Sequence, residues 1–395
     1  MNTAGFDLRR ASDTLQAGLP QYLADLRSLV GIDSGTFDKE GVNRVVDILE
    51  RWYRELGATV ERQPGDVYGD VLTASFQGTG PGSVLLIGHT DTVYPLGTVE
   101  ARRMRADGDQ VIGPGTADMK AGDLSIVYAL RGLLDQGADL PKIVVLHNPD
   151  EEIGSPSSKE VVASLSSDAD AVLVLEPGRE NGDVVVARKG IMDIQIWAEG
   201  RSAHAGVNHD QGRSAVLALA HLVTATEGLN GSLPDLTVNV GRIEGGDRPN
   251  VVPDRAYARL EIRAFDRDVL EGALDRIRRL VETPSVEGTR MRMQVSVEHW
   301  PMHRSEGGER LYQLARGIAG RLGLDLGATA TGGASDGNTA AAAGRPVLDG
   351  LGPVGGRAHS PDEYVVVSSV VPRTALLAGL IAALAHPDLR DPHPA

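Results

Sequence analysis

The sequence contains no cysteine, only four phenylalanines and no apolar run as long as a membrane span. Without cysteine the chain can form neither disulfides nor thiolate ligands, so any bound metal must have nitrogen and oxygen ligands. The longest apolar run, residues 375–385, is shorter than the ~20 residues that a spanning helix needs. The first twenty residues carry no apolar segment of signal-peptide type. We therefore expect a cytoplasmic protein with no membrane partner.

Positive charge is also scarce: 39 Lys and Arg face 54 Asp and Glu, for a formal net charge of -15. Nucleic acids and anionic membranes are bound by cationic surfaces, so this balance argues against both as partners. A chain of 395 residues, of which 41% are hydrophobic and 4% aromatic, can form two domains with aliphatic cores.

Three short apolar runs each lead into possible metal ligands: VLLIGHTDTVYP, IVVLHNPDEEIGS and AVLVLEPG. Such runs are typical of buried parallel strands, whose carboxyl ends meet at one edge of a sheet, where ligands bind. The side chains that we expect at that edge are His89, Asp91, Glu151, Glu152 and Glu176. Imidazole and carboxylate ligands suit a divalent metal, and an uncoordinated carboxylate can act as a base. The pattern predicts a hydrolase with two metals.

The histidine and the carboxylate pair each have a second interpretation. His89 is either a metal ligand whose tautomer Asp91 fixes, or a core histidine beside a helix-capping aspartate. Glu151 and Glu152 are adjacent, so they point in different directions, which suits one ligand and one free base. The alternative is a solvated turn; the apolar strand before the pair and the third strand ending in Glu176 favour a functional role.

The segment GPGTADMKAG begins like a G-x-G-x-x-G dinucleotide motif. Its sixth position is Asp118, and no buried strand directly precedes it, which argues against a dinucleotide site. Asp118 is better placed as a carboxylate that bridges two metals. His359, in GGRAHSPDEYV, is either a further ligand or a loop histidine. We expect no special role for the other histidines, His147, His209, His221, His299, His303, His386 and His393.

The spacing of apolar residues predicts an α/β fold with a mostly parallel sheet flanked by helices on both faces. Residues 187–300 instead alternate in the order strand-helix-strand-strand-helix-strand, which is typical of a small antiparallel α+β domain. We expect this domain to be inserted between two parts of a catalytic metal-binding domain, residues 1–186 and 301–395. Ser157 and Glu160 predict a capping box for a short helix that ends near Leu165.

Eight segments of the chain resemble, in family order, the di-zinc exopeptidases and deacylases. This family includes glutamate carboxypeptidase, aminoacylase and succinyl-diaminopimelate desuccinylase, and the resemblance is greatest to the glutamate carboxypeptidase branch. The segments extend over most of the chain: GHTDTVYP, GPGTADMKAG, NPDEEIGS, LEPG, RSAHAG, GGDRPNVVP, GGASDGNTAA and DGLGPVGGRAHSPDEYV.

The resemblance implies two Zn²⁺ ions per subunit, replaceable by Co²⁺ or Mn²⁺, with Asp118 as the bridge between them. His89 and Glu176 would complete one site, and Glu152 and His359 the other. Glu151 would be the general base, and Asp91 would orient His89.

The resemblance also implies that the inserted domain serves dimerisation or acts as a lid. His204 would stabilise the oxyanion, commonly in the partner subunit's site. Asn250 and Arg263 would contact the substrate, the arginine through the substrate's carboxylate. His209 and Arg213 depart from the family pattern, so the resemblance does not define the detailed pocket.

Together these features predict a homodimeric hydrolase that cleaves an amide bond next to a free carboxylate. A glutamate carboxypeptidase-like enzyme would release a C-terminal amino acid such as glutamate from short peptides or N-acyl conjugates. The alternative within the same chemistry is an aminoacylase or deacetylase of small N-acyl amino acids, because the acyl-side pocket has no recognisable motif. The alternative of another class is a non-catalytic metal-binding scaffold, which would have no use for the free carboxylate of Glu151.

Overall fold

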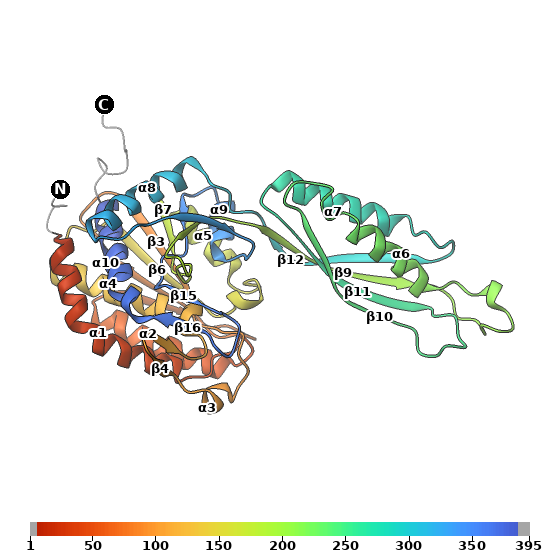
Figure 1. Cartoon of the computed structure of the whole chain (residues 1–395), viewed down its shortest axis with the longest axis horizontal. Helices are drawn as coiled ribbons and strands as arrows, with labels where there is room; N and C mark the ends of the chain where they lie inside the picture. The colour runs from red at the N-terminus through yellow and green to blue at the C-terminus, as the bar shows by residue number, and fades with distance from the viewer. Residues whose placement is uncertain (1–5, 386–395) are drawn as a thin grey trace. The chain divides into compact units, whose positions relative to one another are not determined.

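The computed structural model describes residues 6–385, which form two compact units (Figure 1). The large unit comprises residues 6–186, 304–330 and 335–385, and the small unit comprises Ala187–His303 and Thr331–Ala334. His386 and His393 lie outside the described residues.

The chain leaves the large unit where the sequence pattern changes, but it returns three residues later than expected, after His303. The backbones of Arg188 and Met302 exchange hydrogen bonds of 2.8 and 3.1 Å, which keeps this stretch with the small unit. Thr331–Ala334 also belongs to the small unit, because the backbone N–H of Lys189 donates to Thr331 (3.0 Å).

The large unit is built on a six-stranded mixed sheet. Its strands lie in the order β1 (Thr59–Gln63), β2 (Val71–Phe76), β6 (Lys142–Asn148), β3 (Ser83–His89), β7 (Ala171–Val174) and β14 (Val347–Leu348). The last four strands are parallel to one another. At one edge, β2 is antiparallel to β6, and β1 is antiparallel to β2. The prediction of a mostly parallel sheet is confirmed for the strands that carry the possible ligands.

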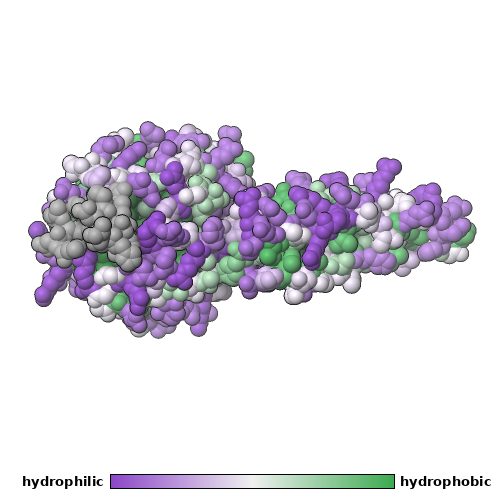
Figure 2. Space-filling model, turned by 90° about the horizontal axis from the view of Figure 1, so that it is seen from above, coloured by the Kyte–Doolittle hydropathy of each residue, from purple (hydrophilic) through white to green (hydrophobic). Residues whose placement is uncertain are grey.

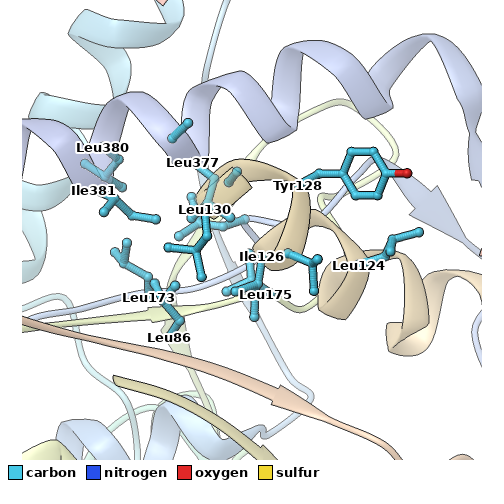
Figure 3. Close-up of a cluster of buried hydrophobic side chains, with 14 of the residues drawn as sticks. Leu86, Leu124, Ile126, Tyr128, Leu130, Leu173, Leu175, Leu377, Leu380 and Ile381 are labelled. Atoms are coloured by element: carbon cyan, nitrogen blue, oxygen red, sulfur yellow. The ribbon is translucent and has the colours of Figure 1, made fainter. Parts of the chain in front are cut away.

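Helices cover both faces of this sheet (Figure 1). The helices of the large unit are α1 (Leu8–Val30), α2 (Lys39–Glu55), α3 (Thr98–Ala101), α4 (Ala121–Asp135), α5 (Lys159–Ser167), α8 (Glu306–Arg321), α9 (Asp336–Ala342) and α10 (Val367–Leu384). Figure 3 shows side chains of α4 and α10 meeting Leu86 and Leu173 of the sheet. Successive strand residues face opposite ways, and their neighbours Leu85 and Val172 are also buried, so the second face is covered too.

The helix α10 extends further than the apolar run in the sequence. It has 18 residues and a mean hydropathy of 1.7, enough in length and composition to cross a membrane. However, 78% of it is buried inside the structure, where it packs against α1, α4 and α8. It is therefore a core helix.

The predicted capping box before α5 is wrong. The helix begins at Lys159, and its N-cap Ser158 makes no side-chain capping bond. The hydroxyls of Ser157 and Ser158 instead donate to the buried carboxylate of Asp150, at 2.7 and 2.5 Å. A capping box needs the serine oxygen to accept a backbone N–H of the helix, but here the charged acceptor Asp150 orients both hydroxyls toward itself.

The small unit is an antiparallel four-stranded sheet with two helices on one face. The strands lie in the order β10 (Thr237–Gly245), β11 (Arg255–Ala264), β9 (Gly190–Glu199) and β12 (Arg290–His299), and the helices are α6 (Ala215–Glu227) and α7 (Arg267–Glu282). Burial alternates along β9, whose buried residues pack against the helices in a separate core. The predicted order of elements is confirmed. Figure 2 shows hydrophilic and hydrophobic residues mixed on the drawn face of this unit.

The remaining strands form two small sheets. One contains β4 (Arg105–Asp107), β5 (Gln110–Ile112), β15 (Gly355–Gly356) and β16 (Tyr364–Val366), and the other pairs β8 (Val184–Arg188) with β13 (Ala328–Thr331).

Candidate metal centre

The candidate ligands of the large unit lie at the carboxyl ends of its parallel strands. His89 is the last residue of β3, Glu151 and Glu152 form a 3₁₀ turn just after β6, and Glu176 follows β7. Two more side chains come from connections: Asp118 from the turn Thr116–Lys120, where its own backbone is not helical, and His359 from the loop between β15 and β16.

The two oxygens of Asp118 face two different histidines. Its Oδ1 lies 3.1 Å from Nε2 of His89, and its Oδ2 lies 3.1 Å from Nε2 of His359. Glu176 Oε1 is 3.6 Å from the His89 nitrogen, and Glu152 Oε2 is 3.1 Å from the His359 nitrogen. Each histidine therefore has one oxygen of Asp118 and one glutamate beside it, which is the arrangement expected of a carboxylate shared by two metals.

Glu151 lies in the same cluster. Its Oε2 is 4.0 Å from Nε2 of His89. Two groups of possible ligand atoms each lie within 4.8 Å, one from His89, Asp118 and Glu152, the other from His89, Glu151 and Glu176. Distance alone therefore does not separate a ligand from a base, and the separate role of Glu151 rests on the family resemblance.

Burial shapes the charges of the cluster. Burial raises the pKa of Glu151 well above its usual range, and it raises the pKa of Glu152 to about 7. Burial also opposes ionisation of Asp118, but hydrogen bonds from His359 and His89 outweigh it and lower the Asp118 pKa. Hydrogen bonds to Asp118 and Glu152 raise the pKa of His359 to about 10.

The cluster has the donor set of a divalent metal site. Four carboxylates surround two imidazoles, so protons must balance the buried negative charge unless a cation does so. Glu152 Oε1 is buried and has no hydrogen-bond partner among the described residues. Carboxylates and imidazoles without thiolate suit zinc, cobalt or manganese. The residues thus fit the metal that the sequence predicts.

Asp91 is fully buried and connects the turn of Glu151 and Glu152 to His89. Its Oδ1 accepts the backbone N–H of Glu151, and its Oδ2 accepts that of Glu152, both at 3.2 Å. The hydroxyl of Thr36 donates to Oδ2 as well (2.7 Å). The Nδ1 of His89 lies 3.0 Å from the Asp91 carbonyl and 3.4 Å from its Oδ1. When Nδ1 carries the proton, the lone pair of the neutral ring is on Nε2, which faces the cluster.

Glu363 positions the turn that carries Asp118, and sequence reasoning missed it. Its Oε1 accepts the backbone N–H groups of Ala117 (2.8 Å) and Asp118 (3.0 Å). Its Oε2 accepts the N–H of Gly115 (3.1 Å) and the hydroxyl of Tyr94 (2.6 Å). Burial raises the pKa of this carboxyl group. In the sequence, Glu363 looks like any acidic residue of a polar loop.

Asp336 is a second missed residue. It is buried at the first position of α9 and accepts the hydroxyl of Ser155 at 2.7 Å. Burial raises its pKa to about 6. Ser155 has a φ of 56° and follows the turn that carries Glu151 and Glu152. Asp336 therefore fixes the far end of that turn, as Asp91 fixes its beginning.

His359 has a left-handed backbone, with a φ of 62°. Residues other than glycine seldom adopt this conformation, and such strain is concentrated at functional sites.

His204 and Asn250 lie together in the small unit. The backbone N–H of Ala205 donates to the Asn250 carbonyl (3.0 Å), and His204 forms a β-bridge with Val251. The N–H of Gly206 donates to His204 Nδ1 at 3.1 Å. By this hydrogen bond, the neutral ring carries its proton on Nε2.

Arg263 lies near the other end of β11, away from His204 and Asn250. Arg263 is eight positions after Arg255, the first residue of this strand, and at about 3.3 Å per position these two residues are roughly 26 Å apart. Its Nε and Nη2 bond Glu261 at 2.8 and 2.9 Å, and its Nη1 donates to the Gly332 carbonyl. Arg213 donates to the carbonyls of Asp210 and Gly212, which gives it a local structural role.

Comparisons with known proteins show which proteins this chain is similar to. The profile of "Peptidase family M20/M25/M40" matches residues 85–383. Carboxypeptidase G2 of Pseudomonas sp. (strain RS-16) is 31% identical over 371 residues, covering 92% of this chain and 89% of that protein. Acetylornithine deacetylase of Edwardsiella ictaluri (strain 93-146) is 27% identical, over 92% of this chain and 97% of that protein.

Solved structures share the fold. A tripeptidase from Staphylococcus aureus superposes with a TM-score of 0.78 at 23% identity, covering 93% of this chain and 98% of that one. An M20 family metallo-carboxypeptidase from Sulfolobus solfataricus gives a TM-score of 0.72 at 16% identity, covering 92% and 99%.

We predict that Glu363→Gln weakens metal binding by roughly 10-fold or more, as expected for a residue that orients a ligand. The amide keeps the size of the side chain, but its nitrogen cannot accept an N–H of the Asp118 turn. The metal dissociation constant, measured by competition with a chelating dye, tests this. Glu309→Gln, the same change on the surface of α8, is the control. Unchanged metal affinity in Glu363→Gln would show that the carboxylate does not position Asp118.

Proposed function

The chain belongs to peptidase family M20/M25/M40, and from this premise we propose that it is a two-metal hydrolase of amide bonds next to a free carboxylate. The observation that carries the proposal is Asp118, whose two oxygens each lie 3.1 Å from a different histidine. The similarity to carboxypeptidase G2 supports the release of a C-terminal amino acid such as glutamate from a short peptide or N-acyl conjugate.

The residues divide into two ligand sets and one base. His89, Asp118 and Glu176 would hold one zinc ion, and Asp118, Glu152 and His359 the other. When bound, such a pair of ions polarises the carbonyl and lowers the pKa of a water from 15.7 to roughly 7. Co²⁺ or Mn²⁺ can replace zinc in this donor set.

Glu151 moves the proton. Its carboxylate takes a proton from the water as the oxygen attacks the carbonyl carbon. It then gives the proton to the amide nitrogen as the C–N bond breaks, so the products are a carboxylic acid and a free amine. Asp91 keeps Glu151 in place through the backbone N–H of Glu151.

The small unit supplies recognition. The Nε2–H of His204 donates to the oxyanion of the tetrahedral intermediate. The guanidinium of Arg263 binds the substrate carboxylate in a bidentate pair, in exchange for Glu261. Asn250 contacts the substrate beside His204.

The positions within the small unit support a homodimer in which His204 acts on the partner subunit's site. An extended dipeptide is only about 7 Å long. His204 and Arg263 of one chain are too far apart along β11 to contact a single substrate of that size. If Arg263 serves its own subunit, His204 and Asn250 must serve another. The edge strand β10 could pair with a second copy of the small unit.

We keep two alternatives to the carboxypeptidase activity. An aminoacylase or deacetylase would use the same residues, and the similarity to acetylornithine deacetylase supports it. A metal-binding scaffold would need the ligands but not Glu151. We also keep a cytoplasmic location as a proposal, supported by composition alone.

The proposed reaction predicts which compounds are hydrolysed. After chelation and reloading with zinc, manganese or cobalt, C-terminal glutamyl peptides should have a higher kcat/KM than acetylated amino acids. Peptides with a C-terminal carboxamide should react at least ~10²-fold more slowly, because Arg263 loses its ionic partner. A preference for acetylated amino acids would favour the deacetylase. If no compound is hydrolysed with any metal, the proposal is wrong.

Replacing Glu151 or Glu152 by glutamine should have different effects on metal content and on kcat. Glu151→Gln should keep two metals per subunit and lose at least ~10²-fold in kcat, because a positioned general base typically contributes that much. Glu152→Gln should lose metal as well as activity. Metal content and kcat of both purified proteins test this. Loss of metal from Glu151→Gln would make Glu151 a ligand.

Complementation tests the shared site. His204→Ala and Glu151→Gln, each inactive alone, should regain activity when mixed under conditions of subunit exchange. A heterodimer then contains one site with a wild-type Glu151 from one chain and a wild-type His204 from the other.

Mixing Glu151→Gln with Glu152→Gln is the matched control, because both changes lie in the large unit and cannot complement through His204. Demonstrated heterodimers without recovery would show that His204 acts within its own chain. A monomer at assay concentration would exclude the shared site directly.

A further inference from the structure

Three fully buried polar side chains, Tyr53, Asp123 and His147, are hydrogen-bonded to one another in the core of the large unit, and we call them the buried triad. They come from α2, α4 and β6, which Figure 1 labels. The Tyr53 hydroxyl lies 2.7 Å from His147 Nε2, and Asp123 Oδ1 lies 3.0 Å from His147 Nδ1. The sequence predicts no special role for His147, because its partners are 94 and 24 residues away in the chain.

The hydrogen bonds of the buried triad run in one direction. Burial raises the pKa of Tyr53 well above its usual range, so the hydroxyl keeps its proton and donates to His147 Nε2. The Nδ1–H of His147 then donates to Asp123, which lies in the first turn of α4, where the helix dipole favours a negative charge. The other oxygen of Asp123, Oδ2, has no hydrogen-bond partner within residues 6–385. In that part of the chain, His147 alone fixes this carboxylate.

The order of the three groups resembles that of a hydrolytic triad, in which a histidine lies between a hydroxyl and a carboxylate. Here, however, all three side chains are shielded from solvent, so a substrate cannot reach Tyr53. Stability alone does not account for the buried triad either, because apolar side chains of similar volume often replace buried charged networks without loss of stability. Its role must therefore lie in what it holds in place.

Asp123 lies directly against the strand end that carries His89. A Cβ on Gly88 would be 2.0 Å from Asp123 Oδ1 and 3.1 Å from His147 Nδ1. Gly88 also pairs with His147 in the ladder between β3 and β6. Only glycine leaves room for the carboxylate at this position, so a displacement of Asp123 changes the packing next to His89.

The start of α4 also lies next to the other two ligands of the set His89, Asp118 and Glu176, which we call the first metal site. The turn that carries Asp118 continues directly into α4. A Cβ on Gly122 would be 2.0 Å from the carbonyl oxygen of Leu175, the residue before Glu176. The first turn of α4 therefore packs against the backbone beside two of the ligands and is continuous with the turn of the third. Its position determines how the three ligands lie relative to one another.

We propose that the buried triad positions the ligands of the first metal site, with His147 fixing the carboxylate at the start of α4. The three residues act through the backbone beside the ligands, so they are positioning residues. The second site depends on them less, because Asp91 holds Glu152 and because His359 comes from the loop between β15 and β16. This inference rests on the two-metal centre of the proposed function.

Two amide variants at position 147 separate the two hydrogen bonds of the histidine. The amide nitrogen of asparagine lies near the place of Nδ1 and can still donate to Asp123. That of glutamine lies near the place of Nε2 and leaves Asp123 without its donor. His147→Gln should weaken the binding of one of the two zinc ions by about tenfold, as expected for residues that orient ligands. His147→Asn should stay within about twofold of the wild type. Competition with a chelating dye gives both dissociation constants.

A second measurement separates positioning from a loss of stability. With Co²⁺ in place of zinc, visible absorption reports the ligand geometry of the folded protein, and the midpoint of urea unfolding reports stability. His147→Gln and Tyr53→Phe should both lower the urea midpoint, since each removes a buried hydrogen bond. Only His147→Gln should change the cobalt spectrum, because Tyr53→Phe keeps the bond to Asp123. His221→Gln, at an exposed histidine of α6, is the control.

Double variants show which metal site is affected. Combined with Glu176→Gln, His147→Gln should weaken metal binding little further, because both changes affect the first metal site. Combined with Glu152→Gln, it should weaken the binding of both ions. An additive loss with Glu176→Gln would contradict the assignment to the first metal site.

The inference is wrong if His147→Gln and His147→Asn bind both ions equally well. It is also wrong if His147→Gln has the cobalt spectrum of the wild type although its urea midpoint is lower, because the buried triad would then serve stability alone. If His147→Gln does not fold, the double variant Asp123→Asn/His147→Gln takes its place. That variant leaves no unpaired buried charge and should show the same loss of metal affinity.

Metal binding is measured without turnover, so the inference and the proposed function can fail separately. If the wild type binds two ions but hydrolyses none of the compounds, the proposed reaction fails, and His147→Gln still decides the role of the buried triad. If the wild type binds no divalent ion, the two-metal centre is wrong, and the positioning role is wrong with it.

Discussion

The buried carboxylate of Asp91 is the constraint on which the centre depends. A carboxylate that is fully shielded from water is costly unless hydrogen bonds satisfy its oxygens. Asp91 obtains those bonds from the backbone of Glu151 and Glu152 and from Thr36, and it lies beside His89 Nδ1. The ends of β3 and β6 are therefore joined through one side chain, and a shift of either strand end would leave a buried charge without its donors. The positions of His89, Glu151 and Glu152 are therefore fixed relative to one another.

The same principle extends outward through other buried carboxylates. Glu363 gathers three backbone N–H groups of the Asp118 turn, and Asp150 gathers the hydroxyls of Ser157 and Ser158. In each case a buried acid fixes a short, irregular connection that has no regular backbone pairing of its own. As a result, many carboxylates lie close to one another and are shielded from solvent. Burial alone would protonate part of this cluster, as the raised pKa values of Glu151 and Glu152 indicate. A divalent cation would stabilise the ionised carboxylates. The concentration of buried carboxylates therefore favours the binding of a metal ion.

The sequence could predict the parts of the site that depend on local pattern. His89, Glu151, Glu152 and Glu176 follow apolar strands, and the carboxyl ends of parallel strands must meet at one edge. The fold and the small unit's order of elements were likewise readable from periodicity. Glu363 was not, because its partners are 245 to 269 residues away in the chain and three of them are backbone N–H groups, which no residue type marks. The capping box failed because Asp150 attracts the serine hydroxyls more strongly than a helix end does.

The two units also differ in how they satisfy their polar groups. In the large unit the functional side chains take part in a dense set of internal bonds and are mostly buried. In the small unit His204 is exposed, and within the described residues its Nε2 has no hydrogen-bond partner, although Gly206 fixes the ring through Nδ1. A histidine whose tautomer is set by its own loop, but whose donor is turned to solvent, is preorganised for an acceptor that its own unit does not provide. Arg263, by contrast, already has a carboxylate partner in Glu261, so in the proposed role it would bind a substrate carboxylate only by exchange. Under the proposed mechanism, oxyanion stabilisation would therefore depend on assembly of two subunits, whereas recognition of the substrate carboxylate would depend on competition with the internal Arg263–Glu261 ion pair.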